Sequence, residues 1–303
     1  MKNISSLEKV VYLSLLLLVL GFGLYIRFDD VKVWKQNENL FFYKGEPLYS
    51  EADSFYFARY ALEWKEGLFK SGEIDPLRFF PDNSSQAKLS EELDFRQKYA
   101  ISGTFISYIF YVLSEITGKS VAWLSYYLIP FLAVSVSVVL YFYFSNLNMP
   151  YVGLLAGLIT VSSPIFLART SLMRLDHDVL NLTLPFLIAY FFLKFFHAQT
   201  KRSRYTYITL ASLTLILYHL WYAHPNLNFV LLLTFFLAYF WSPLKGFVLH
   251  RKWNYSFSKD DLIIFVILIL PQIWYLYAGP YHLYYQVKTL VFNIKSPISA
   301  DIL

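Results

Sequence analysis

The segment RLDHDVL, residues 174–180, contains the ionisable residues of this chain whose spacing is best suited to chemistry. It lies between two long apolar stretches, where ionisable groups are costly unless they are paired or solvated, so such a cluster usually marks a functional site. If the backbone of Asp176, His177 and Asp178 is extended, side chains two residues apart share a face. Both carboxylates can then meet one cation, with His177 turned away.

A third carboxylate, Asp53, lies in the acidic and aromatic segment YSEADSFYFARYALEW, residues 49–64. Asp53, Asp176 and Asp178 would together form an all-oxygen ligand set, which suits Mn²⁺ or Mg²⁺. The chain has no cysteine, and its histidines show no zinc-site spacing, which argues against zinc. The alternative is structural, because Asp-X-Asp is common in loops and aspartate is a natural cap for a helix that begins near Val179.

Two arginines and an aromatic segment accompany the Asp-X-Asp pair. Arg169 and Arg174 either balance charge at the membrane surface or hold a phosphate through two parallel hydrogen bonds. The segment LWYAHP, residues 220–225, is typical of an aromatic belt that ends in a helix-breaking proline. It could equally line a substrate pocket, through Trp221, Tyr222 and His224.

The composition indicates that membrane helices position these residues. Of the 303 residues, 57% are hydrophobic and only 16% are charged, whereas soluble domains carry about 25% charged residues. The formal net charge of +5 does not imply nucleic acid, because membrane proteins concentrate Lys and Arg in cytoplasmic loops. The absence of cysteine excludes disulfides, thiolate metal sites and a cysteine nucleophile.

A helix needs about 20 apolar residues to cross the hydrocarbon core of a membrane, and seven stretches of the chain are close to that length. They lie near residues 10–25, 121–145, 151–168, 179–198, 205–223, 226–243 and 261–279. The first is longer than a signal-peptide core and no small-residue cleavage site follows it, so residues 1–28 are predicted to be a retained signal-anchor helix. The fold predicted is an all-α polytopic membrane protein.

The charge pattern predicts which loops are external. Residues 98–120 are apolar but short and interrupted by serine and threonine, so we expect an interfacial helix that does not cross the membrane. The two most basic loops, 194–204 and 244–260, are then cytoplasmic, as the positive-inside rule requires. This assigns residues 29–120 to a first external loop with interfacial helices.

Residues 121–279 are then expected to hold six further spans, with the Asp-X-Asp pair in an external loop at 169–181. The topology therefore predicts that Asp53, Asp176 and Asp178 share the external side. Residues 280–303 are expected to begin another external loop that is cut short at Leu303.

Four segments resemble, in order and spacing, the catalytic subunit of oligosaccharyltransferase, especially its bacterial single-subunit form. They are SEADSFYFARYA, ARTSLMRLDHDVLNLTLP, LYHLWYAHPN and YHLYYQVKTLVF. The resemblance covers most of residues 9–295, and its most specific part is Arg-Thr followed by Asp-X-Asp. It implies a GT-C-type transmembrane domain, in the bacterial inner membrane, whose site faces the periplasm or lumen.

The resemblance also implies a reaction. A glycan would pass, with inversion, from a polyprenyl pyrophosphate to the asparagine amide of an Asn-X-Ser/Thr sequon in an acceptor protein. By position, Asp53 and Asp176 carry over as metal ligands, and Asp178 as a second amide partner or outer-sphere metal contact. Arg169 matches the family's arginine before Asp-X-Asp and would orient Asp178, whereas Arg174 has no clear counterpart.

The chain departs from the family in its length and in two motifs. It stops where the loop with the family's catalytic glutamate should begin, and it has no Trp-Trp-Asp motif. We therefore expect it to need a C-terminal half for activity. The rival interpretations are another polyprenyl-phosphate-sugar glycosyltransferase acting on lipid or sugar, and a transporter with an external cation site. A transporter would place ionisable residues near the bilayer midplane, whereas the predicted spans are nearly free of charge.

Overall fold

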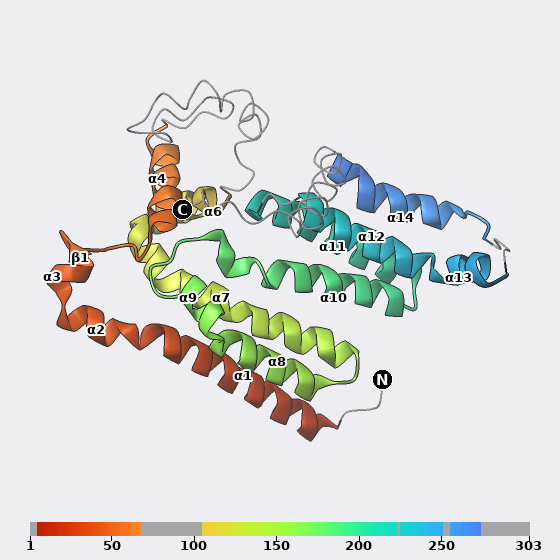
Figure 1. The fold of residues 1–303 in the computed structure, drawn as a ribbon, viewed down its shortest axis with the longest axis horizontal. Helices are drawn as coiled ribbons and strands as arrows, with labels where there is room; N and C mark the ends of the chain where they lie inside the picture. The colour runs from red at the N-terminus through yellow and green to blue at the C-terminus, as the bar shows by residue number, and fades with distance from the viewer. Residues whose placement is uncertain (1–4, 68–104, 223–224, 251–254, 274–303) are drawn as a thin grey trace, which may run out of the picture. The chain divides into compact units, whose positions relative to one another are not determined.

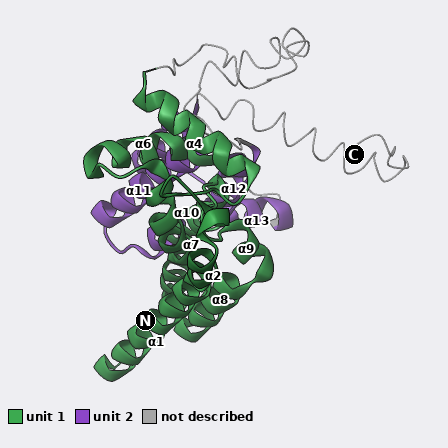
Figure 2. Cartoon of the chain, turned by 90° about the vertical axis from the view of Figure 1, so that its left-hand side faces the viewer, with its two compact units in different colours: residues 1–190, 220–222 green, residues 191–219, 223–303 purple. Residues whose placement is uncertain are grey.

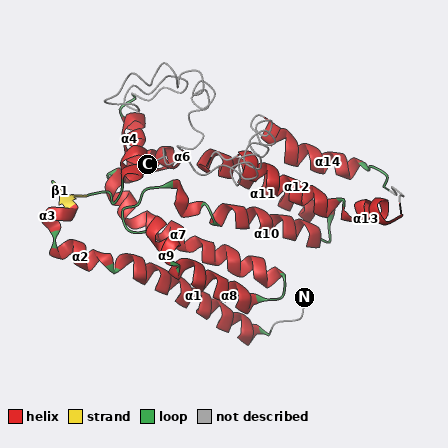
Figure 3. Ribbon diagram, in the orientation of Figure 1, coloured by secondary structure: helices red, strands yellow, loops and turns green. Residues whose placement is uncertain are grey.

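A computed structural model of the chain describes residues 5–67, 105–222, 225–250 and 255–273, and almost all of their regular structure is helical (Figures 1 and 3). The described strands are β1 (Phe42–Tyr43) and β2 (Glu46–Pro47), an antiparallel pair of two residues each. The chain divides into two compact units (Figure 2), residues 1–190 with 220–222 and residues 191–219 with 223–303. The predicted all-α class is confirmed.

The first unit contains the candidate site. Its helices, in chain order, are α1 (Ser6–Phe28), α2 (Asp30–Gln36), α3 (Glu38–Phe41), α4 (Ala52–Lys65), α6 (Phe105–Thr117), α7 (Val121–Asn146), α8 (Pro150–Ser162), α9 (Pro164–Arg169) and the 3-10 helix η2 (His177–Leu180). The second unit has α12 (Pro225–Tyr239), α13 (Trp241–His250), α14 (Lys259–Ile269) and η3 (Leu270–Gln272). Helices α10 (Thr183–His197) and α11 (Lys201–Tyr222) contribute to both units.

Helix α1 begins at a capping box. The Ser5 hydroxyl accepts a hydrogen bond from the Glu8 amide at 3.2 Å, and the Glu8 carboxylate accepts one from the Ser5 amide at 2.8 Å. This satisfies two groups at the helix start that have no helical partner. The helix then runs for 23 residues, about 35 Å at 1.5 Å per residue, which is enough to cross a hydrocarbon core of about 30 Å.

Helices α1, α7 and α8 pack side by side (Figure 1), and glycines on α8 allow its close approach to α7. A Cβ atom at Gly153 would lie 2.8 Å from the Leu140 carbonyl oxygen and 2.8 Å from the Tyr141 Cα. At Gly157 it would lie 3.0 Å from the Ser137 Cβ. Small residues at such contacts are typical of membrane helices, whose association depends on van der Waals packing.

We expect Gly153→Ala to destabilise the protein by about 1–3 kcal/mol, the usual cost of overpacking a tight contact. The atoms that the new methyl group would meet belong to the α7 backbone, so a side-chain rotation cannot relieve the clash. Gly21→Ala is the matched control, because a Cβ there has nothing within 4 Å, and alanine favours a helix by up to about 1 kcal/mol. Unfolding of purified protein in detergent measures both variants, and equal stability of the two would contradict the packing argument.

Three helices among the described residues are long and apolar enough to cross a membrane: Ser6–Gln36, Val121–Asn146 and His177–His197. The pair Asn226–Tyr239 and Trp241–Leu249, bent by 68°, could form a fourth span. The predicted span at 151–168 is divided into α8 and α9 at Ser163, and residues 274–279 of the last one lie outside the described residues. The count of seven spans stays a prediction.

Helix α6 falls within the segment that was predicted to lie in the membrane interface. It has 13 residues, about 20 Å of helix, which is shorter than the hydrocarbon thickness of about 30 Å. Its length fits the predicted interfacial position, and the assignment of residues 29–120 to an external loop stays a prediction.

Candidate functional site

The Asp-X-Asp pair lies at the start of η2, and its backbone is extended only at the first aspartate. Asp176 has φ −143° and ψ 150°, and its side chain accepts a hydrogen bond from the Asp178 amide at 3.4 Å. Asp176 therefore caps a helical turn, as the structural alternative anticipated. This does not exclude a chemical role, because the second carboxylate oxygen of Asp176 takes no part in the cap.

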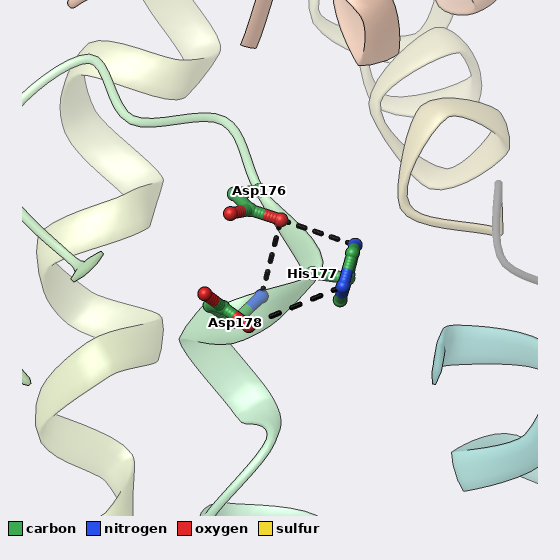
Figure 4. A group of neighbouring side chains, drawn as sticks. All are labelled: Asp176, His177 and Asp178. Carbon is green, nitrogen blue, oxygen red and sulfur yellow. Dashed lines mark hydrogen bonds and ion pairs between the residues drawn. The ribbon is translucent and has the colours of Figure 1, made fainter. Parts of the chain in front are cut away.

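The prediction that His177 turns away from the aspartates is wrong. Its Nδ1 lies 3.0 Å from Asp176 Oδ1, and its Nε2 lies 4.0 Å from Asp178 Oδ1 (Figure 4). The physical reason is that the backbone leaves the extended conformation at His177, where the 3-10 helix begins. Three consecutive side chains therefore gather on one side of the turn.

The first turn of α4 brings further carboxylates to Asp176. One oxygen atom from each of Glu51, Asp53 and Asp176 lies within 4.8 Å of the others. The Ser50 amide donates a hydrogen bond to the Met173 carbonyl at 3.3 Å, which joins the chain before α4 to the chain before Asp176. Asp53 and Asp176 are thus close neighbours despite their separation in sequence, and their role as metal ligands stays a prediction.

Glu51 is a member of the cluster that sequence reasoning missed. The signal was available, because Glu51-Ala52-Asp53 has the same acidic-X-acidic spacing as Asp176-His177-Asp178. Glu51 is partly buried, and its Oε1 atom has no hydrogen-bond partner among the described residues. A buried carboxylate oxygen of this kind needs a hydrogen-bond donor or a cation.

Two arginines contact the carboxylates. Arg169 Nη1 lies 3.3 Å from Asp178 Oδ2, so it makes the contact through which it was expected to orient Asp178. Asn181 Nδ2 donates to Asp178 Oδ1 at 2.7 Å, which holds the other oxygen of the same carboxylate. Arg174 forms an ion pair with Glu51 and donates to the Ala168 carbonyl at 2.6 Å, and its predicted phosphate contact stays a prediction.

The electrostatics of the cluster favour a cation. Burial raises the pKa of the Asp176 carboxyl above its usual range, and the charges of Asp178 and Asp53 raise it further, while His177 opposes them. Burial likewise raises the pKa of Glu51, where Arg174 acts in the opposite direction. Nearby carboxylates disfavour each other's charged form, and an added positive charge relieves this repulsion.

The donor set fits a hard divalent cation. Mg²⁺ and Mn²⁺ prefer carboxylate oxygens, and two ligand atoms of one such ion lie at most roughly 4–5 Å apart. The mutual separations within 4.8 Å of Glu51, Asp53 and Asp176 meet this condition. The Oε1 atom of Glu51, which has no hydrogen-bond partner among the described residues, is available as a further oxygen ligand.

The end of α11 supports the turn that carries the aspartates. Trp221 is 2% exposed, and its Nε1 donates to the His177 carbonyl at 2.6 Å. The Tyr222 and Phe57 rings lie against the His177 ring, with centroids 4.7 and 5.3 Å away. Trp221 therefore supports the backbone of η2 in this structure, whereas the half-buried Tyr222 borders the site. His224, the third predicted substrate contact, lies outside the described residues.

Residues 25–294 match the family described as Oligosaccharyl transferase STT3, N-terminal. The chain belongs to this family. The match covers most of the chain and confirms the resemblance drawn from the SEADSFYF and RTSLMRLDHD segments. A search of curated proteins found no match to the chain.

Membership of the STT3 family makes the chain the N-terminal part of an oligosaccharyltransferase catalytic subunit, and its fold a polytopic GT-C-type transmembrane domain. The family implies a glycosyltransferase in a membrane, with a lipid-linked oligosaccharide donor and a protein acceptor. The carboxylate cluster, both arginines and Trp221 all lie inside the matched residues.

Proposed function

We propose that this STT3 domain serves the transfer of a glycan from a polyprenyl-pyrophosphate carrier to the asparagine amide of Asn-X-Ser/Thr sequons, with inversion and with Mn²⁺ or Mg²⁺ as cofactor. The observation that carries the proposal is the convergence of Glu51, Asp53 and Asp176 to within 4.8 Å. Asp178 lies beside them, fixed by Arg169 at 3.3 Å.

The acceptor amide is the difficult reactant. Its nitrogen lone pair is delocalised into the carbonyl group, as in any amide, so the nitrogen is a poor nucleophile. Carboxylates that accept hydrogen bonds from the amide NH₂ would weaken this delocalisation. We assign this role to Asp53 and Asp178, because Asp53 belongs to the carboxylate cluster and Asp178 lies beside Asp176 in the same turn.

The donor must lose a pyrophosphate. Glycosyl transfer passes through an oxocarbenium-like state, so stabilising the departing group is the main electrostatic requirement. A divalent cation held by Asp53 and Asp176, with Glu51 as a further candidate ligand, would neutralise charge on that pyrophosphate. Arg169 and Arg174 bring positive charge to these carboxylates through their ion pairs with Asp178 and Glu51.

The site is proposed to face the periplasm or lumen, in the bacterial inner membrane. The support is the charge pattern of the chain, in which the basic loops 194–204 and 244–260 are expected on the cytoplasmic side. The Asp-X-Asp loop lies at the other end of the predicted spans. The acceptor protein and the glycan carried by the lipid would meet at that external surface.

Transfer to a sequon peptide tests the proposal. Membranes from cells that produce the full-length protein, including the expected C-terminal half, should glycosylate an Asn-X-Thr peptide from a lipid-linked glycan and leave the matched Gln-X-Thr peptide unmodified. Chelation of divalent cations should abolish the reaction, and added Mn²⁺ or Mg²⁺ should restore it. Full activity after chelation would remove the metal from the mechanism, and glycosylation of lipid or sugar alone would support the rival glycosyltransferase.

A further inference from the structure

A fully buried arginine near the end of α1 is used by none of the roles assigned above. Arg27 is 1% exposed, and no carboxylate pairs with it among the described residues. Its guanidinium instead donates to three oxygens, of Thr170, Gly23 and Val161. A charge in an apolar interior is expensive unless its hydrogen bonds are satisfied, so these partners need an explanation.

Two of the three partners of Arg27, Val161 and Thr170, lie at the C-terminal ends of helices α8 and α9. Arg27 Nη1 donates to the Gly23 carbonyl, in the last turns of α1, at 3.0 Å and to the Val161 carbonyl, near the end of α8, at 3.1 Å. The last carbonyls of a helix have no helical donor and carry partial negative charge. Pro164 has no N–H group to offer them. The guanidinium therefore satisfies the Val161 carbonyl at the end of α8 and gains favourable electrostatics there. Its bond to Gly23, one turn back along its own helix, holds the side chain against α1.

The third partner, Thr170, links Arg27 to the end of α9. Arg27 Nη2 and Nε donate to the Thr170 Oγ1 at 2.7 and 3.3 Å, and that hydroxyl donates in turn to the Phe166 carbonyl at 2.6 Å. Thr170 is completely buried, and the guanidinium lies 5.4 Å from the centre of the Phe166 ring. The side chain thus joins α1, α8 and α9 at one point.

This joint lies where the segment with the Asp-X-Asp pair begins. Thr170 directly follows Arg169, whose guanidinium contacts Asp178 at 3.3 Å. Three residues later, the Met173 carbonyl accepts from Ser50, next to Glu51. The backbone from residue 170 to residue 176 is therefore fixed at its start by Arg27 and again midway by the chain that leads into α4.

We propose that Arg27 is a positioning residue for the carboxylate site, and that it acts through Thr170. By fixing the start of residues 170–178 against α1 and α8, it sets how closely Asp176 approaches Asp53 and Glu51. The same contact explains the threonine of the Arg-Thr pair, whose hydroxyl is the acceptor that the guanidinium requires. An effect of Arg27 on the rate of glycan transfer rests on the proposed function. Its effect on the position of residues 170–178 does not.

Spin labels measure the structural consequence directly. The chain has no cysteine, so Asp30→Cys and Leu182→Cys, both at exposed positions, allow specific labelling of α2 and of the chain after η2. In full-length protein in lipid, we expect Arg27→Gln to broaden the distribution of label distances and Arg27→Lys to restore it in part. Lys32→Gln is the control, because Lys32 is exposed and pairs with Asp29 at the surface.

Transfer kinetics measure the catalytic consequence. We expect Arg27→Gln to lower kcat by up to about 100-fold, the effect of misplacing reacting groups by about 1 Å, with KM for the sequon peptide unchanged. A variant that merely unfolds would lower the amount of active protein, and its remaining folded fraction would keep the unmodified kcat and KM. If Arg27→Gln yields no folded protein, Thr170→Val removes the hydroxyl acceptor and should broaden the same distance distribution.

The two readouts separate the two proposals. Absence of sequon transfer in the unmodified protein would contradict the proposed function and leave the label measurement as the test of the joint. Arg27→Gln and Thr170→Val distance distributions as narrow as that of Lys32→Gln would overturn the positioning role, as would an unchanged kcat in folded Arg27→Gln.

Discussion

Asp176→Asn is expected to abolish glycan transfer and to leave the fold almost unchanged. Asp176 is 2% exposed and belongs to both groups of possible metal ligands, with Glu51 and Asp53 and with His177 and Asp178. Loss of its charge should therefore cost more than the roughly 10- to 100-fold that follows loss of an outer partner of a metal ligand. Asparagine is also a good helix cap, so the hydrogen bond from the Asp178 amide should survive.

The measurement is the rate of sequon-peptide glycosylation, together with Mn²⁺ affinity by electron paramagnetic resonance and unfolding in detergent. Asp30→Asn is the matched control, because Asp30 is an exposed acid in α2 and should change neither rate nor affinity. Asp176→Asn that still binds Mn²⁺ and transfers glycan at the unmodified rate would remove Asp176 from the site. A large loss of stability would instead assign Asp176 to capping alone.

The meeting of Asp53 and Asp176 could be predicted from the sequence because it depends on topology. The charge of the loops predicts which ends of the spans are external, and both acidic segments were assigned to that side. Helix α1 could be predicted for a similar reason, since its length and apolar composition alone determine it. Such properties are averages over many residues, and a single local conformation does not change them.

The orientation of His177 could not be predicted in this way. It depends on whether the backbone leaves the extended conformation at residue 177 or at residue 179, a shift that no periodicity records. The contacts of Arg27 could not be predicted either, because its partner Thr170 is 143 positions away in the sequence. A lone arginine at a helix end resembles an ordinary interfacial residue until its buried partners are known.

Arg174 contacts the carboxylate cluster, which the sequence did not predict. From sequence it was a candidate phosphate ligand, whereas its guanidinium pairs with Glu51, on the carboxylate cluster itself. Two roles of Glu51 follow from this contact. Glu51 either serves as a metal ligand through its free Oε1 atom or serves only as the anchor of Arg174.

Glu51→Gln is expected to weaken Mn²⁺ binding and to lower glycan transfer by about 10- to 100-fold, in the range found for residues that support a metal site. Glutamine keeps the shape of the side chain but removes the negative charge of Glu51, which pairs with Arg174 and contributes to the carboxylate cluster. Glu38→Gln is the control, since Glu38 is an exposed acid in α3. An unchanged Mn²⁺ affinity in Glu51→Gln would exclude Glu51 as a ligand.

Arg174→Gln and the double variant separate the two roles of Glu51. If Glu51 only anchors Arg174, the double variant should be no worse than either single variant, because residues in one contact do not contribute additively. If Glu51 is a ligand, Mn²⁺ affinity should fall in both variants that lack it and persist in Arg174→Gln. A phosphate role for Arg174 predicts a different pattern, in which Arg174→Gln raises KM for the lipid-linked donor while Mn²⁺ affinity stays unchanged. A Mn²⁺ titration thus tests the role of Glu51, and a titration with the lipid-linked donor tests the role of Arg174.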